Sequence, residues 1–153
     1  MTEKDFLLIP EIKEFLPHLT LNNFRLTSPA TSDYNCIAWV VGDEGRCWWP
    51  DAYDTYYWPD NVSRSESLAD FIEFFKSQDY VRCDSPEYEA AYEKIVIYTK
   101  NGLPTHAAKQ TDSALWSSKL GSYHDILHEL GAICGPKYGE VGIIMKRKKT
   151  QQK

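Results

Sequence analysis

The chain has 153 residues, of which 42% are hydrophobic and 25% are charged, a composition typical of one globular domain that buries its core without disulfides. The formal net charge is -5, and because five positive charges lie in the last eight residues, the body of the chain is still more acidic. This charge excludes a basic nucleic-acid groove on the folded part.

The apolar runs are far shorter than the roughly 20 residues that cross a bilayer, so no membrane partner is expected. The N-terminus lacks the pattern of a cleaved secretion signal. A cytoplasmic location is therefore expected, with export that needs no cleaved signal as the alternative. The four cysteines and four histidines are scattered without zinc-site spacing, so neither a metal nor another cofactor is predicted.

The first half of the chain is predicted to be mostly helical. Residues 10–16 form a short helix that ends before Pro17. A second short helix begins at Cys36, with Asp33 as its capping residue, and ends by Gly42. Residues 66–77 give the clearest helix, because Leu68, Phe71, Ile72 and Phe75 share one face and Ser65 or Ser67 can cap it.

The second half changes to the period of two that is typical of strands. The β-branched residues 94–100, followed by Asn101-Gly102, predict a hairpin with residues 103–110. The remaining expected elements are a helix at 85–92, a strand at 114–119, a helix at 123–130 and an edge strand at 140–146. This order predicts one α+β domain over residues 1–146, with N-terminal helices on an antiparallel sheet of about four or more strands. Residues 147–153 are expected to form a flexible basic tail.

One cysteine and one histidine suggest chemistry. A thiol in the first turn of a helix is favoured as a thiolate by the helix dipole and by free amides, which applies to Cys36. A nucleophilic cysteine also needs an imidazole base, and His106 on the predicted hairpin is the best candidate. The alternatives stay open: a buried structural cysteine and a strand histidine with satisfied hydrogen bonds are common.

Three short motifs carry a resemblance to a known superfamily. They are YNC with AW at residues 34–39, PTHAA at 104–108 and WSSKLG at 116–121. Over about residues 30–146 the chain resembles the papain-like cysteine peptidases, particularly their compact NlpC-type and CHAP-type members. It looks most like a sparsely characterised bacterial family of small proteins.

The resemblance implies a papain-like fold and a thiol hydrolase. Cys36 would attack an amide or ester carbonyl, and His106 would act as base and then as acid. Asn35 or Tyr34 would assist the backbone amides in stabilising the oxyanion. The expected third residue after the histidine is His, Asn, Gln, Asp or Glu, whereas the matching strand offers only Ser118; Asp112 and Asp125 are further options.

Other polar and aromatic residues are open to two interpretations. The aromatic segment from Cys47 to Trp58 lines a substrate groove or packs as a lid on the core helices. Lys119 recognises a substrate carboxylate or simply faces solvent. His124 and His128 lie four residues apart on the predicted helix, but no third metal ligand accompanies them. The candidate substrate-binding residues are Trp48, Trp49, Trp116 and Lys119.

Two functions remain in competition. One is a thiol amidase, peptidase or acyltransferase whose partner is a peptide or other amide substrate. The other is a non-catalytic interaction protein on the same scaffold, of an immunity or regulatory type, whose partner is a protein. The missing carboxylate or amide in third position favours the second function.

Overall fold

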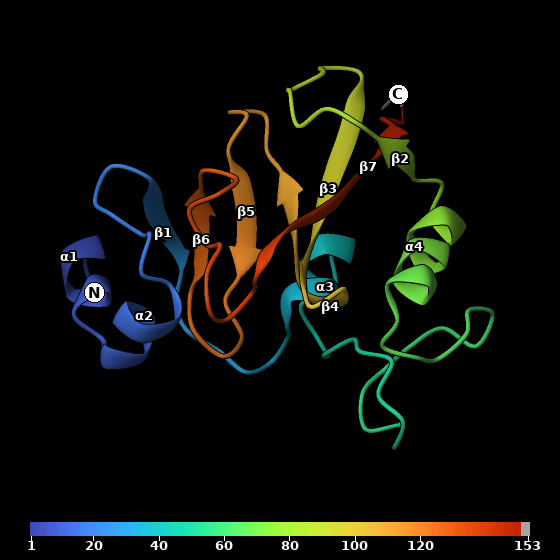
Figure 1. Ribbon diagram of the computed structural model, residues 1–153, viewed down its shortest axis with the longest axis horizontal. Coiled ribbons are helices and arrows are strands. Elements are labelled where there is room, and N and C mark those ends of the chain that lie inside the picture. Colours follow the sequence, from blue (N-terminus) through green and yellow to red (C-terminus); the bar gives the residue numbers. More distant parts are fainter. Residues whose placement is uncertain (151–153) are drawn as a thin grey trace.

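The computed structural model describes residues 1–150, and these form one seven-stranded sheet with four short helices (Figure 1). The helices are α1 (Glu3–Leu7), α2 (Pro10–Phe15), α3 (Cys36–Val41) and α4 (Leu68–Ser77). The strands are β1 (Phe24–Ser28), β2 (Val81–Cys83), β3 (Tyr92–Lys100), β4 (Leu103–Gln110), β5 (Trp116–Lys119), β6 (Asp125–His128) and β7 (Glu140–Lys148). The strand order is β1-β6-β5-β4-β3-β7-β2, and every neighbouring pair is antiparallel.

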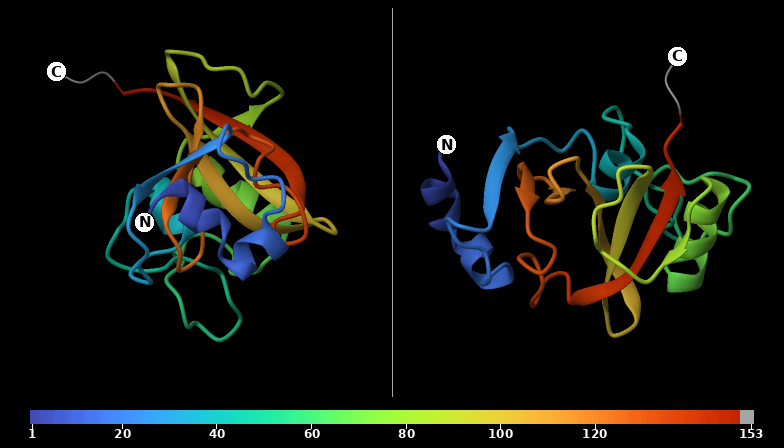
Figure 2. Two further views of the ribbon diagram at one scale, coloured as in Figure 1. Left: turned by 90° about the vertical axis from the view of Figure 1, so that its left-hand side faces the viewer. Right: turned by 90° about the horizontal axis from the view of Figure 1, so that it is seen from above.

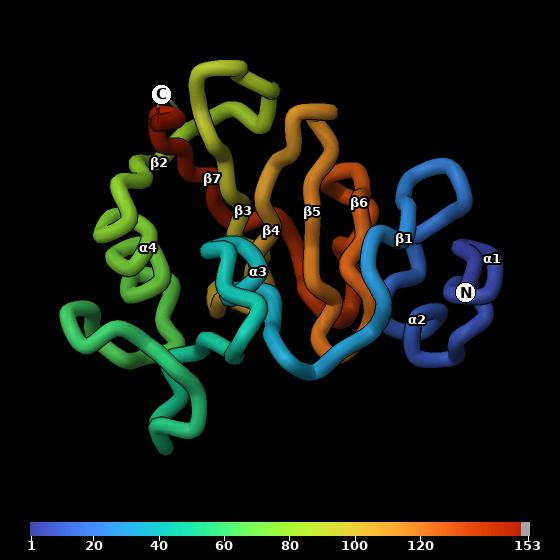
Figure 3. Tube along the Cα trace, turned by 180° about the vertical axis from the view of Figure 1, so that it is seen from behind, coloured from blue at the N-terminus to red at the C-terminus, as the bar shows by residue number. Residues whose placement is uncertain are grey.

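Three of the four helices lie at the ends of this sheet, and α3 lies near its middle. In Figure 1, α1 and α2 lie beside β1, whereas α4 lies beside β2 and β7 at the other end. Figure 3, from behind, shows α3 in front of β4, and Figure 2 shows that the sheet is strongly twisted. The expected α+β class with an antiparallel sheet is confirmed.

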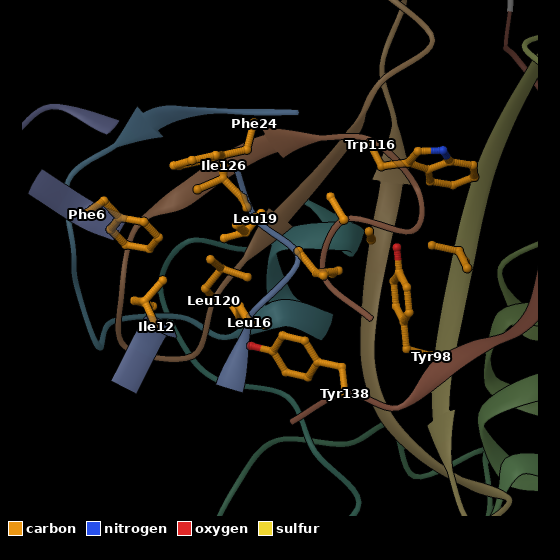
Figure 4. Packing of buried hydrophobic residues seen from close by; sticks show 14 of the residues in the cluster. Phe6, Ile12, Leu16, Leu19, Phe24, Tyr98, Trp116, Leu120, Ile126 and Tyr138 are labelled. Atoms are coloured by element: carbon orange, nitrogen blue, oxygen red, sulfur yellow. The ribbon is translucent and has the colours of Figure 1, made fainter. Parts of the chain in front are cut away.

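Two hydrophobic clusters form the core, on opposite sides of β3. Because neighbouring side chains in a strand point to opposite faces, Tyr98 and Ile97 belong to different clusters. The α1–α2 cluster includes Phe6, Ile12, Leu16, Phe24, Val96, Tyr98, Trp116, Leu120, Ile126 and Tyr138 (Figure 4). The α3–α4 cluster includes Cys36, Ile37, Trp58, Phe71, Phe74, Phe75, Ile95, Ile97, Ala107 and Met145.

Helix α3 begins at Cys36, as predicted, but its capping residue is Asn35 and not Asp33. The Asn35 Oδ1 atom accepts a hydrogen bond from the Ala38 amide at 3.2 Å, which satisfies one of the free donors of the first turn. At the other end, Gly42 has φ 85°, the left-handed conformation that commonly ends a helix. The cap fixes the position of Cys36.

Helix α4 confirms the predicted 66–77 helix within two residues, with Ser67 as its cap. The aromatic segment before it folds back onto the helix. The Trp48 and Trp58 rings pack on Phe74, with centroids 5.9 and 4.7 Å apart, and the Trp49 ring packs on Phe71 at 5.1 Å. These contacts support the lid interpretation of the segment.

Two predicted helices are wrong. Residues 123–130 contain strand β6, which pairs with β1 and β5. Residues 85–92 form no helix, because the buried Lys94 ammonium binds the carbonyls of Ser85 and Glu87 and the carboxylate of Glu89. A helix would need some of these carbonyls as acceptors for its own backbone hydrogen bonds.

The last strand ends later in the sequence than predicted. Strand β7 lies between β3 and β2 and continues to Lys148, so it is an interior strand and includes Arg147 and Lys148 from the expected tail. Residues 151–153 lie outside the described part. Helix α1 and strands β1 and β2 were not predicted. Within residues 1–150, every helix is too short or too polar to span a bilayer.

Candidate functional site

The sulfur of Cys36 lies where the N-terminus of α3 meets β4. The backbone amides of Ala107, Ile37 and Cys36 itself donate toward the sulfur. The side chain is only 7% exposed, and this burial raises the pKa of the thiol to about 11, against the opposing effect of the amides. Cys36 is therefore a thiol, held by amide donors, at neutral pH.

His106 projects from β4 and is 2% exposed. It pairs across the hairpin with Tyr98, and its ring stacks on Tyr138 with centroids 4.1 Å apart. Burial lowers the pKa of His106 well below its ordinary value, and the nearby His128 lowers it further. The imidazole is neutral, and its buried Nε2 atom has no hydrogen-bond partner among the described residues.

The structure brings Cys36 and His106 to the same part of β4 without joining them. The sulfur contacts the amide of Ala107, the residue after His106, and no hydrogen bond links the sulfur to the imidazole Nε2. Tyr138 covers one face of the imidazole, with ring centroids 4.1 Å apart. Strand β5 pairs with β4 only at Lys109 and Gln110. The edge of β4 that faces β5 is therefore unpaired at His106.

Ser118 contacts a histidine, but a different one from that predicted. Its Oγ atom lies 2.7 Å from Nε2 of His128 on β6. Nδ1 of His128 lies 2.7 Å from the carbonyl oxygen of Glu129, which can only accept, so Nδ1 carries the proton and the Ser118 hydroxyl donates to Nε2. Burial lowers the pKa of His128 to about 4, so this pair is neutral.

His128 contacts the predicted site residue Ser118, a contact that the sequence did not predict. The sequence predicts His128 on a helix beside His124, whereas the structure places it on strand β6. The contact forms because β6 pairs with β5, which no short motif in the sequence specifies. Among residues 1–150, no group of three or more His, Cys, Asp or Glu side chains is arranged to hold a metal ion.

The two predicted oxyanion donors are engaged elsewhere. Asn35 Nδ2 donates to the Trp48 carbonyl at 2.8 Å, while its Oδ1 accepts from the amides of Ala38 and Trp48. The Tyr34 hydroxyl donates to Oδ2 of Asp125 at 2.8 Å. Asn35 thus positions the start of α3.

Lys119 is fully buried and does not face solvent. Its ammonium donates to the carbonyls of Gly121 and Tyr123, and its antiparallel partner on β6 is Asp125. Burial lowers the pKa of Lys119, whereas the charge of Asp125 raises it. Lys119 and the hydrogen-bonded pair of Tyr34 and Asp125 therefore form a group of neighbouring buried polar side chains that sequence analysis did not anticipate.

The three predicted substrate-binding tryptophans are all held by the protein's own contacts. Trp116 is 2% exposed and belongs to the α1–α2 cluster. Trp48 donates from Nε1 to Asp43 at 2.8 Å, and its ring packs on Tyr57 at 4.5 Å. Trp49 donates from Nε1 to Glu66.

No curated protein and no solved structure matches the chain. One family model, described as a domain of unknown function (DUF7689), matches residues 25–146. The match extends from β1 nearly to the end of β7 and includes Cys36, His106 and His128. The chain therefore belongs to the DUF7689 family.

Proposed function

We propose that this protein is a papain-like thiol hydrolase that cleaves an amide or ester bond, with Cys36 as nucleophile and His106 as base. The observation that carries the proposal is that the Cys36 sulfur lies at a helix N-terminus, beside the residue that follows His106 on β4. A thiol in this position, next to a strand that supplies the imidazole, is the arrangement on which papain-like chemistry depends.

The unpartnered nitrogen of His106 supports its role as a base. Buried polar atoms in folded proteins nearly always have a hydrogen-bond partner, and the exceptions are frequent in functional sites. Because the pKa of His106 is lowered, the ring keeps an unprotonated nitrogen at neutral pH. That nitrogen accepts the thiol proton as the sulfur attacks the carbonyl, and it returns the proton to the leaving group.

Backbone amides supply the charge stabilisation that the reaction requires. The amides of Ile37 and Ala107 point toward the sulfur, where negative charge develops as the thiol loses its proton, and in this proposal they also stabilise the oxyanion that forms on the attacked carbonyl. His128 is neutral and hydrogen-bonded to Ser118 near His106, and we assign this pair the role of a positioning device for the imidazole.

Acetylation by p-nitrophenyl acetate tests this function directly. The Cys36 sulfur attacks the acetyl carbonyl, His106 takes the thiol proton, and p-nitrophenolate leaves, so a thioester remains until water hydrolyses it. We expect release of p-nitrophenolate together with an acetyl group on the peptide that contains Cys36. The Cys36→Ala variant should lose both signals, and His106→Phe should slow both by about 10²-fold or more.

The matched control is Cys83→Ser, because Cys83 is a partly buried cysteine away from the site. This variant should react like the wild type. Acetylation that spreads over several cysteines, or that persists at the wild-type rate in His106→Phe, would refute the proposed pair.

The second candidate function is a non-catalytic interaction protein on the same scaffold. The observation that favours it is the state of the nucleophile: Cys36 is 7% exposed, and burial raises the pKa of its thiol to about 11. A cysteine that remains unmodified until the protein unfolds would support this function. The acetylation experiment therefore separates the two candidates.

A further inference from the structure

The aromatic segment packs its tryptophans on α4 but leaves its tip exposed. Residues 52–57, which form this tip, are all exposed, and they include three tyrosines. The exposed fractions are 92% for Tyr53, 46% for Tyr56 and 36% for Tyr57. Figure 1 and Figure 3 both show this part of the chain projecting from the body of the molecule, below the sheet. Exposed tyrosines gathered on one loop are typical of surfaces that bind another protein.

Arg64 ties the two sides of the tip together. Its guanidinium donates to the carbonyls of Asp51 and Tyr56 at 3.0 and 3.1 Å, and it forms ion pairs with the carboxylates of Asp51 and Asp54. The Asp51 carboxylate also accepts hydrogen bonds from the backbone amides of Thr55 and Tyr56. A loop that is ordered before it binds loses less conformational entropy on binding, so these contacts organise the tip for recognition.

The charge around the tip defines the chemistry of its partner. Residues 43–66 contain six carboxylates, two arginines and no lysine, so their net charge is -4. Arg46 and Arg64 both form ion pairs with aspartates of this region. Glu44 and Asp60 are exposed, and neither has an ion pair within residues 1–150. The region is therefore complementary to a basic protein surface.

Arg46 shows how this region binds a cationic side chain. Its guanidinium carbon lies 3.5 Å from the centre of the Tyr57 ring, and its Nε atom donates to Oδ2 of Asp43 at 2.9 Å. One arginine of the chain itself is thus held between an aromatic face and a carboxylate. Tyr53 precedes Asp54, whose side chain is 83% exposed, so the tip offers a partner an exposed ring beside an exposed carboxylate.

We propose that the tip of the aromatic segment is a docking surface for a protein partner that presents arginine side chains. The exposed tyrosines supply the rings on which guanidinium groups stack, and the surrounding carboxylates supply the attraction. The same charge repels nucleic acids and acidic protein surfaces. This inference does not involve Cys36, and it holds whether or not the protein is a hydrolase.

Selection from a phage-displayed library of short random peptides tests the chemistry of the partner. The immobilised wild-type protein is the target, and the composition of the bound peptides is compared with that of the unselected library. We expect arginine to be enriched about threefold or more, because each stacked guanidinium contributes to binding. The enrichment should disappear when the target is the double variant Tyr53→Ser/Tyr56→Ser. Bound peptides without enriched arginine, or the same enrichment on both targets, would overturn the proposal.

NMR then locates the bound peptide. N-acetyl-Gly-Arg-Gly-Arg-Gly amide is titrated into the ¹⁵N-labelled protein, and the probe for comparison has citrulline, which is uncharged, in place of each arginine. We expect saturable shifts of the amide signals of residues 52–57 with the arginine peptide and much smaller shifts with the citrulline peptide. Equal shifts with both peptides, or shifts confined to other residues, would contradict the assigned surface.

A pair of tyrosine variants separates ring stacking from attraction by charge alone. Tyr53→Ser/Tyr56→Ser and the matched control Tyr88→Ser all keep the net charge, and Tyr88 is a partly buried tyrosine outside the aromatic segment. The shifts should be lost in the double variant and remain in the control. Binding that survives in the double variant would reduce the surface to an acidic patch and overturn the proposal. A wild type that dimerises through the tip, seen by analytical ultracentrifugation and absent in the double variant, would replace the partner with a second copy of the chain.

Discussion

The Cys36 sulfur accepts a hydrogen bond from the backbone amide of Ala107, the residue that follows His106 on β4. A helix that begins at residue 36 therefore meets a strand about seventy residues further along the chain, at the point where that strand carries the predicted base. Amide donors favour negative charge on sulfur, whereas burial opposes it, and the raised pKa shows that burial dominates in the resting protein.

Asn35 should be important for stability because it joins α3 to the aromatic segment. Its side chain caps the Ala38 amide and makes two hydrogen bonds to the backbone of Trp48, at 2.8 and 3.0 Å. Asn35→Ala should lower the free energy of unfolding by about 2 kcal/mol, measured by urea denaturation. Asn35→Asp keeps the acceptor and loses only the donor to Trp48, so its effect should be smaller; an equal loss would show that the cap contributes little.

Lys119 should be a structural residue. Lys119→Met leaves the carbonyls of Gly121 and Tyr123 without their donor and leaves Asp125 buried without its nearby cation. The free energy of unfolding should fall by about 3 kcal/mol. Lys76→Met provides the control, because it removes an exposed ion pair with Glu73 and should change stability by less than about 1 kcal/mol. Similar small effects for both variants would show that the network does not stabilise the fold.

His128 should make the protein less stable in acid. Its pKa in the folded state is lowered by burial to about 4, below the ordinary value of 6.5. Above pH 6.5 neither state binds the proton, so His128 has no effect; between pH 6.5 and 4 the unfolded state binds it first, and stability falls. The loss reaches about 3 kcal/mol and is constant at lower pH.

The variant His128→Gln isolates this contribution, since glutamine keeps hydrogen-bonding groups without titrating. The difference in unfolding free energy between wild type and variant should change across this pH range, as measured by urea denaturation at several pH values. A difference that is independent of pH would contradict the assignment of a buried neutral imidazole.

The sequence predicted the elements whose signals are local. Helix α3 has a polar cap and a terminal glycine, α4 has four apolar residues on one face, and Asn101-Gly102 marks the β3–β4 hairpin. Strand β6 was mistaken for a helix because its short apolar pattern fits both periods, and its pairing with β1 and β5 decides the outcome. In the same way, residues 85–92 do not form the expected helix, because their carbonyls bind the ammonium of Lys94, which follows them in the chain.

The candidate site could be predicted only in part, for the same reason. Sequence spacing singled out Cys36 and His106, but the contacts that determine their chemistry come from other strands. The Tyr138 ring reaches His106 from the segment before β7, and His128 reaches Ser118 from β6. The burial that raises the pKa of Cys36 and lowers that of His106 arises from the packing of two core clusters, which no short motif specifies.

The rate at which iodoacetamide modifies Cys36 in the folded protein, measured against pH, tests the central claim most directly. A thiol with a pKa of about 11 that reacts unassisted gains about tenfold in rate per pH unit, because its thiolate fraction does. His106 is deprotonated throughout this range, so base assistance predicts a nearly constant rate from about pH 6 to about pH 8, and loss of that rate in His106→Phe. A tenfold rise per unit that is the same in both proteins, or no labelling before unfolding, would contradict a working pair of Cys36 and His106.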